Sequence, residues 1–183
     1  MIPVALDPAR LRLGLAGRGS AMTRRLAALR EGGAQPIAVF CDAPTQAADA
    51  ESVIARLPDA GDMDRLDLLW IVGLPDELAT ALAGTARARR VLVNVEDRPA
   101  LCDFHSVAAI RRGDLMITVS TAGRSPGLAA RIRESLARQF GPEWADRLEH
   151  VAELRRRWRE EGRSMAENAD LTEALVRSMG WLA

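Results

Sequence analysis

The stretch RLGLAGRGSAMTRRLAALREGGA, from Arg12 to Ala34, decides the fold. Its apolar start, Arg12–Ala16, predicts a strand, and apolar residues at helical spacing in Ala21–Glu31 predict a helix. Gly32 and Gly33 end the helical pattern. A strand, a glycine turn and a helix in this order form the first half of a βαβ unit. In such a unit the turn either binds a phosphate or only reverses the chain.

Similar patterns continue to about residue 112. Further strands are predicted at Pro36–Phe40, Leu68–Val72 and Val91–Val95, and helices at Thr45–Leu57 and Asp76–Arg89. Strands that are apolar on both faces and alternate with helices predict a parallel sheet covered on two sides. The fold class is therefore α/β, with a Rossmann-type parallel sheet.

The pattern then changes to an antiparallel hairpin followed by helices. The hairpin is predicted from Ser106–Ile110 and Leu115–Ser120. Ser125 is a candidate N-cap, with Pro126 in the first helical position, for a helix that runs to about Phe140.

The last forty residues are predicted to be helical. One apolar stripe is formed by Trp144, Leu148, Val151, Leu154 and Trp158. Asp170 and Glu173 are spaced as a capping box for a final helix through Met179.

Composition excludes several classes of protein. The net charge is zero, so no nucleic-acid partner is expected. All 25 basic side chains other than histidine are arginine, which excludes a Schiff-base lysine and a P-loop lysine. Cys41 and Cys102 have no CxxC spacing, and no metal site is predicted. The longest apolar run, Leu66–Leu74, is too short to span a bilayer, and no signal peptide is recognised, so a cytoplasmic protein without a membrane partner is expected.

The glycine turn alone leaves two interpretations open. Gly17 and Gly19 occupy the first two glycine positions of a dinucleotide-binding turn, but the third falls on Met22. Cys41 and Asp42 follow the second strand, where an acidic residue would bind the adenosine ribose. The turn is therefore either a cofactor site or a structural strand–helix junction.

The later part of the chain carries a set of linked motifs. They are the strand end Asn94-Val95-Glu96-Asp97, the loop Leu101-Cys102-Asp103-Phe104, the basic turn Arg111-Arg112-Gly113 and the run LMITVSTAGRSP at Leu115–Pro126. Together they resemble the siroheme-synthase N-terminal family of precorrin-2 dehydrogenases. Some members of that family are also sirohydrochlorin ferrochelatases. The resemblance covers about Arg12 to Gln139.

The resemblance implies an organisation, a reaction and a set of site residues. It implies an NAD-binding Rossmann domain at 1–105, a dimerisation segment at 106–141 and a helical domain at 142–183. The implied function is NAD-dependent oxidation of precorrin-2 to sirohydrochlorin by a homodimer. A ferrochelatase activity with Fe²⁺ as a substrate stays open. Asp97 occupies the family's catalytic position. Candidate cofactor residues are Gly17, Arg18, Gly19, Ser20, Ala21, Cys41, Asp42 and Gly73, and candidate substrate residues are His105, Ser120, Thr121 and Arg124.

Two departures from the family pattern motivate an alternative function. Arg18 stands where the family usually has glycine, and Gly73-Leu74-Pro75-Asp76 replaces a usual A-T-D-D. The alternative is a non-catalytic member that binds a tetrapyrrole or a nucleotide. Retained NAD binding would distinguish the enzyme from this alternative.

Overall fold

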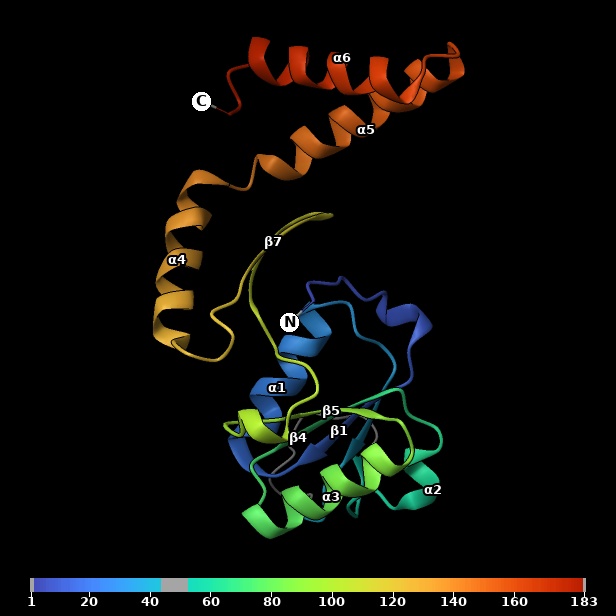
Figure 1. Cartoon of the computed structure of the whole chain (residues 1–183), viewed down its shortest axis with the longest axis vertical. Coiled ribbons are helices and arrows are strands. Elements are labelled where there is room, and N and C mark those ends of the chain that lie inside the picture. Colours follow the sequence, from blue (N-terminus) through green and yellow to red (C-terminus); the bar gives the residue numbers. More distant parts are fainter. Residues whose placement is uncertain (1, 44–52, 183) are drawn as a thin grey trace. The chain divides into compact units, whose positions relative to one another are not determined.

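The computed structural model describes residues 2–43 and 53–182, and the chain forms two compact units, Met1–Ser106 and Val107–Ala183 (Figure 1). The strands of the first unit are β1 (Leu13–Gly17), β2 (Ile37–Phe40), β3 (Val53–Ile54), β4 (Leu68–Val72) and β5 (Leu92–Val95). Its α-helices are α1 (Gly19–Glu31), α2 (Ala60–Met63) and α3 (Asp76–Ala88), and short 3-10 turns lie at Pro8–Arg10 and Pro99–Leu101.

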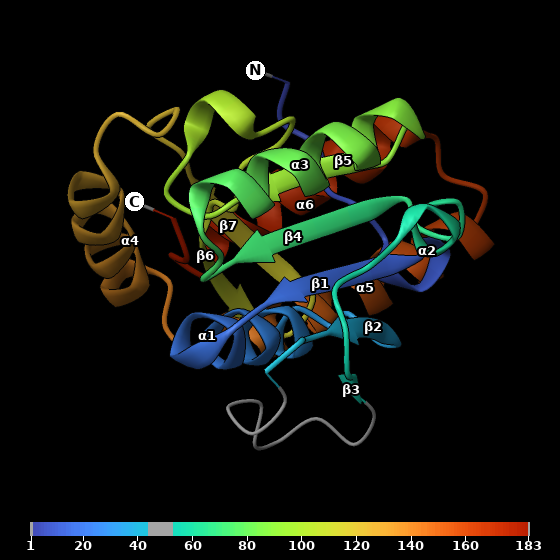
Figure 2. The same cartoon turned by 90° about the horizontal axis from the view of Figure 1, so that it is seen from below.

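The five strands form one parallel sheet in the order β3-β2-β1-β4-β5. The central strand β1 pairs with β2 and β4, and Leu13 lies opposite both Ile37 and Leu68. Figure 2 shows β2, β1 and β4 side by side, with α1 and α3 on opposite faces of the sheet. The prediction of a Rossmann-type α/β sheet is therefore confirmed.

Strand β4 shows why both faces of the sheet are covered. Its side chains alternate between two hydrophobic cores, because successive residues of a strand point to opposite faces. Trp70 packs in the core that contains Met22 of α1. Its neighbour Ile71 packs in the core that contains Leu82 of α3. The unbroken apolar sequence of this strand reflects burial on both sides.

The helix predicted at Thr45–Leu57 is corrected in part. Residues 44–52 lie outside the described residues. Val53–Ile54 forms strand β3, which pairs with the end of β2 in register Val39↔Val53. Both residues are β-branched and suit a sheet edge better than a helix.

The second unit contains the predicted hairpin and three helices. The hairpin strands are β6 (Ala108–Arg112) and β7 (Leu115–Val119), paired antiparallel. The helices are α4 (Pro126–Gln139), α5 (Trp144–Glu160) and α6 (Met165–Ser178). Ser125 caps α4 as predicted, because its Oγ accepts a hydrogen bond from the Leu128 amide at 3.3 Å.

The predicted start of the last helix is wrong. Helix α6 begins at Met165, and its capping box is formed by Ser164 and Glu167. Asp170 and Glu173 lie inside the helix. Gly162, at φ +79°, follows the end of α5 and allows the turn that brings Ser164 into the cap position.

Two glycines bring the turns after β1 and β4 into backbone contact. A Cβ on Gly17 would lie 2.4 Å from the Val72 carbonyl oxygen, and a Cβ on Gly73 would lie 2.4 Å from the Arg18 carbonyl oxygen. The Arg18 amide donates to the Val72 carbonyl at 3.3 Å. Gly73 also has φ +62°, which an L side chain rarely adopts. Both turns therefore require glycine.

We predict that Gly17→Ala lowers the free energy of unfolding by roughly 1–3 kcal/mol, because the added methyl group meets a backbone oxygen that has little room to move. Gly84→Ala is the matched control. Gly84 lies in α3 with nothing within 4 Å of an added Cβ, so this change should be neutral or add about 0.5–1 kcal/mol. Urea unfolding measures both variants. If Gly17→Ala has the same free energy of unfolding as the wild type, the turn after β1 can relax around a side chain.

Candidate functional site

The glycine turn presents the start of α1 at the carboxyl edge of the sheet. β1 ends at Gly17, Arg18 is the extended N-cap residue, and α1 begins at Gly19, which has φ +62°. The Arg18 side chain makes no capping hydrogen bond to the described part of α1. Ser20 and Ala21 lie in the first turn of the helix, where backbone N–H groups have no intrahelical partner. This end of α1 is suited to an anion such as a pyrophosphate.

Arg18 turns away from the helix and pairs with Asp42. Its Nε donates to Oδ1 of Asp42 at 2.6 Å, and its Nη2 donates to Oδ2. This two-point contact holds the pKa of the Asp42 carboxyl below its usual value, chiefly through the side-chain hydrogen bonds from Arg18. The sequence places both residues at candidate cofactor positions but does not show that they bind each other.

Cys41 makes a different contribution from its neighbour Asp42. Its side chain is fully buried in the core beneath α1, and its amide donates to the Ile54 carbonyl at 3.0 Å. It packs at the end of β2 and is not accessible to a ligand at this edge.

The loop after β4 forms the next part of the edge. Gly73 is exposed, whereas Leu74 is buried in the core beneath α3. Asp76, the first residue of α3, forms an ion pair with Arg98 from the loop after β5. The departure Gly73-Leu74-Pro75-Asp76 therefore has an acid at the start of α3, and Arg98 binds that acid.

Three acidic residues around the end of β5 have different surroundings. Glu96 accepts from Arg25 of α1 at 3.2 Å, and the same arginine donates to the Ser106 hydroxyl at 2.8 Å. Asp103 accepts from Arg87 and from the Val93 amide, each at 2.9 Å.

Asp97 contrasts with these two neighbours. It is exposed in the turn directly after β5 at φ 60°, and no arginine partner is found for it among the described residues. Asp97 is thus the acid in this group that is open to a ligand.

The candidate substrate residues lie in both units. His105 belongs to the first unit and is half-buried. Ser120, Thr121 and Arg124 belong to the second unit, in the loop before α4. The Thr121 hydroxyl donates to the Ser125 carbonyl at 3.0 Å, and Ser120 Oγ accepts from the Ala122 amide at 3.2 Å. Both hydroxyls shape the loop, and the exposed Arg124 is its cationic group.

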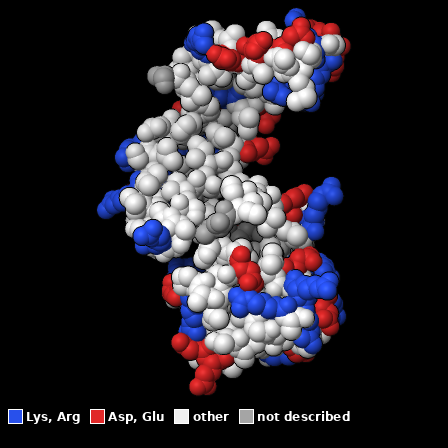
Figure 3. Space-filling view, in the orientation of Figure 1, with Lys and Arg blue, Asp and Glu red and all other residues white. Residues whose placement is uncertain are grey.

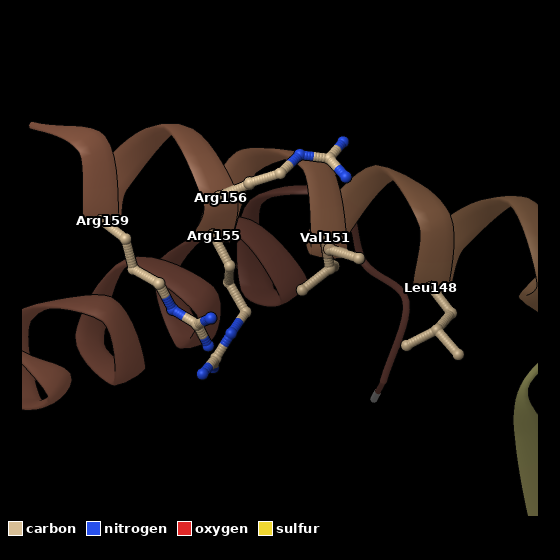
Figure 4. Close-up of a pocket in the computed structure, with 6 residues that line it drawn as sticks. Leu148, Val151, Arg155, Arg156 and Arg159 are labelled. Atoms are coloured by element: carbon tan, nitrogen blue, oxygen red, sulfur yellow. The ribbon is translucent and has the colours of Figure 1, made fainter.

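The arginine-rich end of α5 forms a shallow groove rather than a built site. The groove has a volume of about 380 Å³. Its lining residues all lie on α5, and they are Leu148, Val151, Ala152, Arg155, Arg156 and Arg159. In Figure 4 the side chains of Arg155 and Arg159 extend to the same side of the helix, and that of Arg156 extends to another. A groove lined by one face of a single helix is open to solvent and carries no enclosed binding cavity.

Charged side chains and potential metal ligands are both dispersed in the described part of the chain. Figure 3 shows arginine and acidic side chains interspersed over the visible face of the first unit. Among the described residues, no group of three or more histidine, cysteine or acidic side chains is placed to hold a metal ion. Within residues 2–43 and 53–182, no helix is both long and apolar enough to cross a bilayer.

Sequence reasoning missed the contacts that organise this edge. Arg25 and Glu96 are far apart in the chain, and no spacing rule joins them. The excess of arginine over lysine was the one available signal, because guanidinium groups suit two-point contacts with carboxylates.

Comparisons with known proteins place this arrangement in a family. Residues 4–108 match the family described as putative NAD(P)-binding, and residues 112–139 match the sirohaem biosynthesis protein central family. A siroheme synthase of Methylococcus capsulatus is 31% identical over 171 residues, which are 87% of this chain and 35% of that protein. The siroheme biosynthesis protein met8 of Schizosaccharomyces pombe is 34% identical over 83 residues, 45% of this chain and 31% of that protein.

A solved structure shares the fold. SirC, a precorrin-2 dehydrogenase, superimposes with a TM-score of 0.72 at 21% sequence identity, covering 96% of this chain and 89% of SirC. The matched part of this chain spans about a third of the length of each of the two relatives from Methylococcus and Schizosaccharomyces. The match to the sirohaem biosynthesis protein central family extends over β7 and α4, and because the first match covers more than half of the chain, the protein belongs to the family described as putative NAD(P)-binding.

Proposed function

We propose that this protein is a cytoplasmic, NAD-dependent precorrin-2 dehydrogenase of siroheme biosynthesis. The observation that carries the proposal is the glycine-lined edge of the sheet. There, the start of α1 faces the turn after β4, and Asp97 follows β5. The family match, the siroheme synthase relatives and the SirC fold support it.

The cofactor residues have separate tasks. Gly17 and Gly73 let the turns after β1 and β4 lie in backbone contact, which sets the position of the start of α1 at the carboxyl edge of the sheet. The amides of Gly19, Ser20 and Ala21 bind the pyrophosphate at the start of α1. When bound, NAD supplies the hydride acceptor.

Asp97 carries the proton chemistry in this proposal. Oxidation of precorrin-2 removes a hydride and a proton, and the proton needs an acceptor at the carboxyl edge. Glu96 and Asp103 are held by Arg25 and Arg87, whereas Asp97 is exposed. Arg124 is the candidate partner for a carboxylate of the tetrapyrrole.

We expect NAD to bind the wild-type protein and Gly19→Asp to abolish that binding, because the carboxylate would face the pyrophosphate. Gly162→Asp is the matched control. It puts the same side chain at another positive-φ glycine, in the second unit, and should leave binding unchanged. Calorimetry gives the affinities, and circular dichroism checks that the variants fold. A wild-type protein that shows no heat with millimolar NAD or NADH would overturn the dehydrogenase proposal.

Asp97→Asn should lower the rate of precorrin-2 oxidation by roughly 10²-fold while NAD affinity stays the same, since the pyrophosphate turn is elsewhere. Asp146→Asn, at an exposed position in the first turn of α5, controls for the loss of a carboxylate. Single-turnover absorbance under anaerobic conditions measures the rates. If Asp97→Asn reacts at the wild-type rate, Asp97 only shapes its turn.

We further propose that the protein is a homodimer through residues 106–140. The hairpin has only two strands and carries open edges in the described part of the chain. Apolar side chains are also exposed on this segment, namely Val107, Met116, Leu128 and Ile132. A partner subunit would cover both features.

Light scattering should give about twice the mass of the chain at micromolar concentration. Leu128→Glu combined with Ile132→Glu should raise the dissociation constant by at least about tenfold, because two charges would be buried in the interface. Met165→Glu changes an exposed apolar side chain on α6 and should leave the dimer intact. A wild-type monomer at these concentrations contradicts the dimer proposal.

A further inference from the structure

The contact between Arg18 and Asp42 lies where a dinucleotide would place its adenosine ribose. β2 runs parallel to β1 with Phe40 opposite Ala16, so the two strands end at the same edge of the sheet. Asp42 follows β2, and Arg18 follows β1. The carboxylate after the second strand is the group that accepts ribose hydroxyls in sites for NAD.

Both oxygens of that carboxylate receive a hydrogen bond from the arginine. Oδ1 accepts from Nε at 2.6 Å and Oδ2 accepts from Nη2. The exposed fractions are 30% for the Arg18 side chain and 33% for that of Asp42, so a ligand can reach the pair from solvent. The carboxylate is therefore accessible, but its charge is balanced by a guanidinium.

This pairing changes what the ribose position can accept. An isolated carboxylate accepts the hydroxyls of NAD and repels the 2′-phosphate of NADP, whereas a nearby arginine accommodates that phosphate. A guanidinium has five N–H donors, and Asp42 uses one on Nε and one on Nη2. Arg18 can keep its contact with Asp42 and still present N–H groups to a phosphate.

We propose that Arg18 neutralises Asp42 at the adenosine end of the site, so that the site binds NADP as well as NAD. Arg18 thereby sets the cofactor specificity. The inference rests on the proposed function, because it assumes that a dinucleotide occupies the edge formed by Gly17 and Gly73. It gives a role in cofactor binding to Arg18, which stands where the family pattern has glycine.

Binding of NAD and NADP to the intact protein, measured by calorimetry, tests this proposal without any assay of turnover. The wild-type dissociation constants for the two dinucleotides should agree within about tenfold. Arg18→Gln should weaken NADP binding by roughly tenfold or more and change NAD binding much less, because the uncovered Asp42 carboxylate then faces the 2′-phosphate. Arg18→Gln combined with Asp42→Asn should recover part of the NADP affinity, since the repelling charge is gone.

Arg10→Gln is the control for the loss of one positive charge. Arg10 pairs with the exposed Asp7 in the same unit, and the change should leave both affinities as they are. A wild-type preference for NAD above a hundredfold would overturn the inference and leave the proposed function standing. An Arg18→Gln variant whose ratio of NADP to NAD affinity equals that of the wild type would likewise overturn the inference and leave the proposed function standing. Failure of both dinucleotides to bind would overturn the proposed function and this inference with it.

Discussion

The backbone contact between the turns after β1 and β4 is the constraint on which the rest of the edge depends. Gly17 lies against the Val72 carbonyl and Gly73 against the Arg18 carbonyl, with no space for a side chain at either glycine. The contact sets where α1 begins and leaves the first-turn amides of the helix without a side-chain cap from Arg18, whose guanidinium pairs with Asp42. Larger residues at the two positions would separate the turns and alter the edge.

Arginine pairing gives this edge its electrostatic character. Arg18 binds Asp42, Arg25 binds Glu96, and Arg98 binds Asp76. Each pair joins two elements or connections that are distant in the chain, so the pairs hold these parts of the edge together as well as balance charge. Asp97 stands apart from them as an exposed acid after β5. An edge at which several acids are paired with arginine can admit an anionic dinucleotide, while the exposed Asp97 carboxylate is available for proton transfer.

The sequence predicts the sheet well because burial on both faces leaves unbroken apolar runs, as in Leu68–Val72. It does not predict β3, which has only two residues. Spacing alone does not locate the start of α6, since Ser164–Glu167 and Asp170–Glu173 have the same spacing and the chain uses the first pair, which follows the turn at Gly162. Ion pairs such as Arg25–Glu96 depend on the three-dimensional arrangement of the chain, and neither periodicity nor spacing specifies them.

Hydride transfer is the central claim, and anaerobic incubation of the protein with precorrin-2 and NAD tests it most directly. The absorbance of the mixture reports NADH and sirohydrochlorin at the same time. The account predicts that both form together in equal amounts, over repeated turnovers, and only when the protein is present. Binding of NAD and precorrin-2 without formation of NADH would contradict the account and favour a non-catalytic tetrapyrrole-binding protein.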